Sequence, residues 1–197
     1  MNQSVQSQSD AALLATLVGT RTAANVLRLS QGSLSRLLLD DPSPLPLPEA
    51  VTRTLQSTRE LVRRALAEAM RAGDVLASPN NVRDYLKLNF AHQQYESFVV
   101  LFVDAQNRVL ACEEMFRGTL TQTAVYPREV VKRALAVNAA AVILAHNHPS
   151  GLAEPSFADN TLTRSLANAL SMVDVRVLDH LIVAGNTVLS YAERGLL

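Results

Sequence analysis

The chain has 197 residues, of which 48% are hydrophobic and 18% are charged, with 18 basic and 18 acidic side chains. A chain of this size can bury one core, or one core and a small helical appendage. Its formal net charge of zero provides no overall field that would attract nucleic acid or an anionic membrane. The single cysteine excludes an internal disulfide, and no stretch has the features of a signal peptide or the roughly 20 apolar residues of a membrane-spanning helix. We therefore expect a soluble protein of the reducing cytoplasm.

The first part of the chain is predicted to be helical. Residues 1–10 contain few apolar side chains and are predicted to be a disordered tail. From residue 11 to about residue 39, apolar residues recur at helical spacing with one break, which predicts two or three short helices. Four prolines in DDPSPLPLP, residues 40–48, predict a stiff, extended connector, and a longer amphipathic helix then runs to Gly73. We treat residues 11–76 as one helical N-terminal region.

The period of the apolar pattern changes in the second part of the chain. β-branched and aromatic side chains fill SFVVLFV, and aliphatic ones fill AAVILAH, as is typical of buried strands. The patterns predict a helix over residues 82–88, strands over 97–103, 108–116, 119–125 and 140–146, helices from Pro127 and Ser156, and a closing hairpin over 175–191. The predicted fold class is α/β (α+β), with helices flanking a mixed β-sheet over residues 77–197 and a small all-helical segment before it.

The stretch AHNHPSGLAEPSFADN, residues 145–160, carries the residues with the most distinctive chemistry. His146 and His148 leave a predicted strand two residues apart, so their side chains project to the same side. Asp159 lies near the start of the next helix, where a loop turned by prolines and a glycine could bring its carboxylate beside them. Two imidazoles and one carboxylate leave a fourth tetrahedral position for water, which is the arrangement of a catalytic zinc site. We therefore predict Zn²⁺ bound by His146, His148 and Asp159.

The spacing of these residues, H-x-H followed after seven residues by S-x-x-D, resembles the JAMM motif of the JAB/MPN metallopeptidases. The strings GTLTQTAVYPREVVKRAL, HNHPSG, VRVLDHLIVAG and SYAERGLL are similar to the RadC-related branch of that family, from about Ser78 to the end of the chain. The resemblance implies a JAB/MPN-like domain over residues 77–197 and a zinc-dependent hydrolase that cleaves a peptide or isopeptide bond.

The resemblance also implies two catalytic side chains. Glu96, directly before the predicted strand SFVVLFV, matches the glutamate that serves as general base, which must come within hydrogen-bond reach of the attacking water. Glu113 and Glu114 are rival candidates on the predicted partner strand, where we expect a surface or rim position. Ser156 is predicted to cap the following helix and, by the resemblance, to stabilise the oxyanion of the reaction.

Other residues of the second part have structural interpretations. Asp179 and His180 match a paired position in RadC relatives, and we favour a buried, hydrogen-bonded histidine there over one that supports a metal ligand. His92 and Cys112 have no convincing partner and are interpreted as structural.

The helical N-terminal region resembles a degenerate helix-hairpin-helix module, which RadC relatives often carry. Phosphate-binding hairpins expose backbone N–H groups at glycines, whereas this chain has PSPLPLPEAV at that place. Residues 1–80 contain eight Arg or Lys and seven Asp or Glu, a surplus of one positive charge. Nucleic acid is therefore only weakly supported as a partner.

Three functions remain open on the sequence alone. The first is a zinc metallopeptidase with an unidentified peptide or protein substrate. The second is a RadC-like DNA-repair or mobile-element accessory protein that binds DNA. The third is a non-catalytic scaffold that zinc stabilises. The sequence names neither the substrate nor the oligomeric state, and it predicts no membrane partner.

Overall fold

A computed structural model describes residues 5–38, 45–90, 93–118 and 124–197 of the chain. These residues divide into two compact units between Ala65 and Leu66. The first unit contains α1 (Asp10–Val18), α2 (Thr20–Leu29), α3 (Leu34–Leu38) and the first part of α4 (Glu49–Arg71). Its buried core consists of Leu14, Ala23, Val26, Leu37, Val51 and Leu55. The sequence predicted two or three short helices and a long one, and the structure contains three short helices and the long helix α4.

Two predictions for the first unit fall partly outside the described residues. Residues 1–4 of the predicted tail lie outside them, while Val5–Ser7 form one 3-10 turn and Ser9 already caps α1. Residues 40–44 of the predicted proline connector also lie outside them, and residues 45–48 contain no regular secondary structure before α4 begins. Among the described residues, regular secondary structure therefore begins within the predicted tail.

The second unit is built on a five-stranded sheet in the order β2-β1-β3-β4-β5. Only β3 and β4 run parallel, and the other neighbouring pairs are antiparallel. A parallel pair needs a long crossover, which α7 provides between β3 and β4. The strands are β1 (Ser97–Val103), β2 (Val109–Arg117), β3 (Ala141–Asn147), β4 (Arg176–Ala184) and β5 (Thr187–Ser190). The mixed α/β prediction is confirmed, with β3 at the centre and buried along its whole length.

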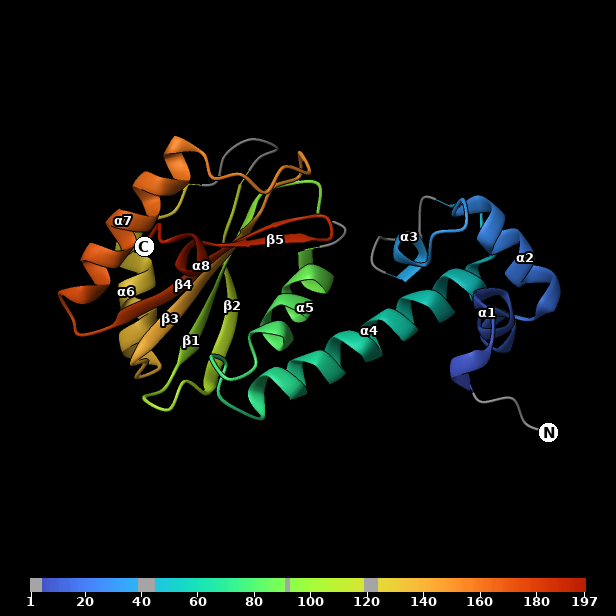
Figure 1. Ribbon diagram of the computed structural model, residues 1–197, viewed down its shortest axis with the longest axis horizontal. Helices are drawn as coiled ribbons and strands as arrows, with labels where there is room; N and C mark the ends of the chain where they lie inside the picture. The colour runs from blue at the N-terminus through green and yellow to red at the C-terminus, as the bar shows by residue number, and fades with distance from the viewer. Residues whose placement is uncertain (1–4, 39–44, 91–92, 119–123) are drawn as a thin grey trace. The chain divides into compact units, whose positions relative to one another are not determined.

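Helices cover both faces of this sheet, and strand alternation assigns each side chain to one of them. Helices α6 (Pro127–Ala136) and α7 (Phe157–Ser171) lie over one face, and α5 (Pro79–Phe90) lies over the other (Figure 1). The α6 and α7 face buries Phe98, Val100, Phe102, Val142 and Leu144 of the sheet. The α5 face buries Val99, Leu101, Val103, Ile143 and Ala145. A short helix, α8 (Tyr191–Arg194), follows β5.

The predicted and observed boundaries differ at two places. The sequence separates the two regions after residue 76, whereas the compact units divide within α4, because Ala67 and Met70 near its end are buried in the core of the second unit. Of the predicted strand over residues 119–125, positions 119–123 lie outside the described residues, and residues 124–126 are not in a strand. Among the residues that the structure describes, no helix has both the length and the hydropathy that a bilayer crossing requires.

Candidate metal centre

The central strand β3 presents two histidines where it ends. His146 is the second-last residue of β3, and His148 continues alongside β4 by donating its backbone N–H to the Val183 carbonyl at 2.9 Å. Because the two residues lie two positions apart, both rings project to the face of α6 and α7. Their Nε2 atoms are 3.0 Å apart. The predicted pair therefore meets at the carboxyl end of the strand.

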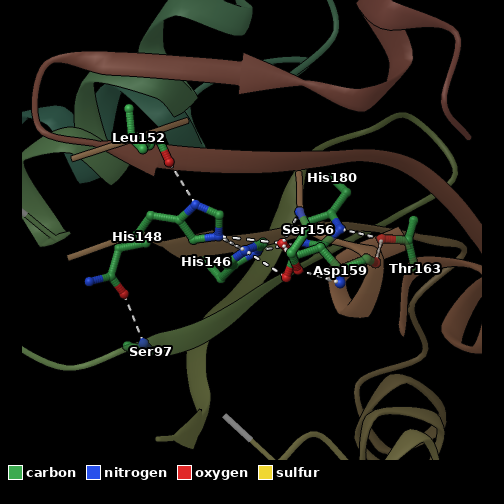
Figure 2. A network of polar contacts seen from close by, with 9 residues as sticks. Ser97, His146, His148, Leu152, Ser156, Asp159, Thr163 and His180 are labelled. Carbon is green, nitrogen blue, oxygen red and sulfur yellow. Dashed lines mark hydrogen bonds and ion pairs between the residues drawn. The ribbon is translucent and has the colours of Figure 1, made fainter. Parts of the chain in front are cut away.

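Asp159 reaches the same point from the first turn of α7. Its Oδ1 lies 3.2 Å from Nε2 of His146, and its Oδ2 lies 3.4 Å from Nε2 of His148. A capping box fixes the carboxylate, since Oδ2 accepts from the Ser156 N–H at 2.7 Å and from the Ser156 hydroxyl at 2.6 Å. The predicted helix cap and the predicted position of Asp159 beside the histidines are thus both present (Figure 2).

A chain of hydrogen bonds behind His146 determines which of its ring nitrogens carries the proton. Thr163 Oγ1 lies 2.6 Å from the Asp159 carbonyl oxygen and 2.6 Å from His180 Nδ1. A carbonyl oxygen only accepts, so the single hydroxyl hydrogen points to it and the hydroxyl accepts from His180 Nδ1–H. His180 Nε2 then accepts from Nδ1–H of His146 at 2.8 Å. This leaves Nε2 of His146 with a lone pair that faces Asp159.

His148 is oriented by the loop that follows it. Its Nδ1 lies 2.7 Å from the carbonyl oxygen of Leu152, which can only accept, so Nδ1 carries the hydrogen. The loop turns at Gly151, which has a φ of 81° and donates its N–H to the His148 carbonyl at 3.1 Å. Such a positive φ strains residues that have a Cβ. When the His148 ring is neutral, its lone pair is therefore on Nε2, and only the protonated ring can donate from Nε2 to Asp159.

The donors fit a zinc ion in chemistry and in spacing. Two ring nitrogens with lone pairs and one carboxylate converge, and all their ligand atoms lie within 4.8 Å of one another. Such a set of electron-rich atoms repel one another unless a cation lies between them. Ligands of a tetrahedral zinc with bonds of about 2.0 to 2.1 Å are about 3.3 Å apart. The two Nε2 atoms are 3.0 Å apart, and each lies close to a different oxygen of Asp159, at 3.2 Å for His146 and 3.4 Å for His148. Three protein ligands also leave a fourth position open, as in catalytic sites.

The electrostatics of the centre favour an ionised Asp159. Burial opposes ionisation of Asp159, but its close contacts with the rings of His146 and His148 and the hydrogen bond from Ser156 outweigh it and hold the pKa of the carboxyl far below its usual range. The hydrogen bond to Asp159 raises the pKa of His148 against the effect of burial. Burial lowers the pKa of His180 well below its ordinary value, so that ring is neutral, as the hydrogen-bond chain requires.

Zinc affinity is expected to depend steeply on pH. Because the pKa of His148 is raised in the metal-free protein, a metal ion that binds this ring would have to displace a proton. Below that pKa the affinity is expected to fall about tenfold for each pH unit, and above it to level off. Competition with a chelating dye between about pH 6 and 8.5 measures this, and an affinity independent of pH would contradict it.

Glu96 lies at the entrance of β1, which pairs with β3 in the register Phe98 to His146. Its carbonyl accepts from the Gly118 N–H at 2.8 Å, and its negative charge contributes to raising the pKa of His148. The rivals are engaged elsewhere. Glu113 accepts hydrogen bonds from Arg133, which lower its pKa, and Glu114 contacts Arg117 and Gln93. Glu96 therefore contributes to the raised pKa of His148, whereas Glu113 and Glu114 contact arginines of α6 and β2.

Three further residues support the centre, and the sequence did not identify two of them. His180 was interpreted as a structural histidine, yet it binds the ring of His146 directly. No sequence pattern distinguishes Thr163 or the Leu152 carbonyl, because a threonine within a helix and a backbone oxygen occur in any sequence.

The other residues singled out in the sequence lie away from the metal centre or outside the described residues. Asp179 accepts from Ser190 Oγ, which fixes the start of α8, and Cys112 lies half-buried on β2. His92 lies outside the described residues.

Replacing His180 with phenylalanine tests the support behind His146. Phenylalanine keeps an aromatic ring at position 180, but it offers no acceptor to Nδ1–H of His146. The His146 ring can then flip or change tautomer. We expect zinc affinity to fall about 10- to 100-fold, as for other residues that orient metal ligands. A chelator competition assay measures it, with Asn168→Ala on the exposed side of α7 as the control. An unchanged affinity would show that His180 does not orient the ligand.

The fold and the site together define an α/β domain with a candidate centre of two histidines and one aspartate at the carboxyl end of a central strand. A family model described as a RadC-like JAB domain matches residues 76–196, which is more than half of the chain. The chain belongs to this RadC-like JAB-domain family.

Curated bacterial relatives agree with this assignment. A protein of Thiobacillus denitrificans is 64% identical over 147 residues, which are 75% of this chain and 66% of the relative. Proteins of Chromobacterium violaceum and Leptothrix cholodnii are 49% and 52% identical, over 100% and 96% of this chain and 93% and 90% of their own length. All three are named only as UPF0758 proteins, a name that states no activity.

Proposed function

We propose that the chain is a zinc-dependent hydrolase of the JAMM type that cleaves a peptide or isopeptide bond. One observation carries the proposal. When both rings are neutral, the hydrogen bonds of His146 and His148 place the ring hydrogens on Nδ1, so that two Nε2 lone pairs and the Asp159 carboxylate converge. Membership of the JAB-domain family is compatible with hydrolysis.

His146, His148 and Asp159 would hold the zinc. When bound there, zinc supplies a Lewis acid that polarises a carbonyl and lowers the pKa of a water towards about 7. The buried position of these donors at the strand end limits their hydration, which strengthens the electrostatic interactions among them.

The remaining chemistry belongs to the side chains. Glu96 takes a proton from the water that attacks the scissile carbonyl and delivers it to the leaving amine. Ser156 donates its hydroxyl to the oxyanion that forms on the substrate carbonyl. In the structure the Ser156 hydroxyl donates to Asp159 Oδ2. To donate to an oxyanion instead, the hydroxyl hydrogen must rotate about the Cβ–Oγ bond towards the substrate.

DNA binding finds less support in the charges of α4. Arg53 pairs with Glu49, and Arg63 and Arg64 both pair with Glu60. These intrahelical pairs neutralise part of the arginine-rich side that a phosphate backbone would need. A zinc-stabilised scaffold differs from the enzyme only in turnover, so the assay below separates the two.

Incubation of the zinc-loaded chain with peptides derived from a bacterial proteome tests the proposal. New carboxyl termini, which hydrolysis of either a peptide or an isopeptide bond produces, are expected by mass spectrometry with the loaded chain and not after treatment with a chelator. Peptides that carry an isopeptide branch belong in the same mixture. If the zinc-loaded chain produces no new termini from either class of substrate, the scaffold is the better account.

A further inference from the structure

Asn147 lies between the two histidines of the metal centre, but its side chain projects to the other side of β3. Alternation along the strand places His146 and His148 towards α7, and it places Asn147 on the face that α5 covers. The asparagine is 4% exposed. A buried amide needs partners for its donor and its acceptor, because an unsatisfied buried polar group is costly.

Both partners of this amide are backbone groups beside Glu96. Asn147 Oδ1 accepts from the Ser97 N–H at 2.8 Å, the bond whose dashed line ends at Ser97 in Figure 2. Asn147 Nδ2 donates to the Tyr95 carbonyl at 2.9 Å. The two bonds therefore bracket Glu96, one on the residue before it and one on the residue after it.

A third hydrogen bond holds the same segment from the side of β2. The Glu96 carbonyl accepts from the Gly118 N–H at 2.8 Å, directly after β2 ends at Arg117. Three successive backbone positions, 95 to 97, are thus held by residues of two neighbouring chain segments. Only asparagine offers a donor and an acceptor at this reach from β3, since aspartate lacks the donor and aliphatic residues lack both.

We infer that Asn147 is a positioning residue that sets the place of the Glu96 carboxylate relative to the zinc ligands. The inference rests on the proposed function, because it matters for catalysis only if Glu96 is the base. Asn147 would then position Glu96 from one face of β3, while its neighbours His146 and His148 hold the metal on the other face. Misplacement of a reacting group by about 1 Å can cost about 100-fold in rate.

Two measurements that need no substrate come first. In Asn147→Ala, the Ser97 amide is expected to exchange with deuterium at least about tenfold faster, while amides inside β1 and β3 keep their protection. Zinc content is expected to equal that of the wild type, because the three ligands are untouched. Asn168→Ala is the matched control. If the Ser97 amide keeps its protection, or if zinc is lost, Asn147 does not act as inferred.

A double-mutant cycle then separates positioning from general support of the fold. Asn147→Ala is expected to lower kcat about 100-fold with KM unchanged in the wild-type background, and to have no further effect in the Glu96→Gln background. Equal losses in both backgrounds would mean that Asn147 acts independently of Glu96, which overturns the inference.

If the alanine variant does not fold, Asn147→Asp is the alternative test of the inference. It keeps the size of the side chain and the acceptor for Ser97, but it faces the Tyr95 carbonyl with an oxygen. Protection of the Ser97 amide is then expected to persist while kcat falls, and an unchanged kcat would overturn the inference. A chain with no turnover in any variant refutes the proposed function, whereas the exchange result still decides whether Asn147 fixes this backbone.

Discussion

Replacing Glu96 with glutamine is expected to lower kcat by about 10²- to 10⁴-fold, which is the usual contribution of a positioned general base. Glutamine keeps the size of the side chain but cannot take up a proton. Zinc content and melting temperature are expected to stay unchanged, because Glu96 is not among the converging ligand atoms. Steady-state kinetics on a peptide substrate, metal analysis and a thermal melt measure the three quantities.

Glu113→Gln is the matched control for this substitution. Glu113 is bound to Arg133, so its loss is expected to affect a surface ion pair of β2 and α6 and to leave kcat within about twofold of the wild type. A Glu96→Gln variant with wild-type kcat would remove Glu96 from the mechanism. A variant that lost zinc and melted earlier would instead indicate a structural role.

Replacing Asp159 with asparagine is expected to lower zinc affinity by more than about 100-fold. Metal sites lose 10- to 100-fold from changes in residues that only support the ligands, and here a charged ligand itself is removed. Asparagine keeps an oxygen that can accept from the Ser156 N–H, so the start of α7 is preserved. Titration of the metal-free protein with zinc in the presence of a competing chelator measures the affinity.

His148→Ala is expected to give a loss of similar size, and Asp84→Ala provides the control. Asp84 is exposed on α5, where its carboxylate forms an ion pair with Lys87. Circular dichroism of each variant establishes that the fold is retained. Zinc affinity equal to that of the wild type in Asp159→Asn would show that the carboxylate is not a ligand.

The sequence predicts the helices and strands of the second unit well, because their side chains determine burial locally. SFVVLFV is buried along its whole length, and AVILAH ends at the residue where the ligands begin. The convergence of His146, His148 and Asp159 was also predictable, because the two histidines lie two positions apart on a strand and the spacing to Asp159 resembles the JAMM motif. Ser156 was predictable as a helix cap from its position before α7.

The supports of the site were not predictable, because they depend on contacts between distant segments. Asn147 acts on Tyr95 and Ser97 only when β1 pairs with β3. His180 contacts His146 only when β4 lies parallel to β3. An asparagine or a histidine in a strand has many structural uses, and the sequence of one strand does not say which residue lies opposite.

The metal content of the wild-type chain tests the central claim most directly. We predict one zinc per chain after purification without added chelator, with an X-ray absorption spectrum that shows two imidazole ligands and oxygen ligands, and no sulfur. A chain that neither retains nor takes up zinc would contradict the account. So would a spectrum with a sulfur ligand, since it would assign the metal to Cys112 and not to the centre of His146, His148 and Asp159.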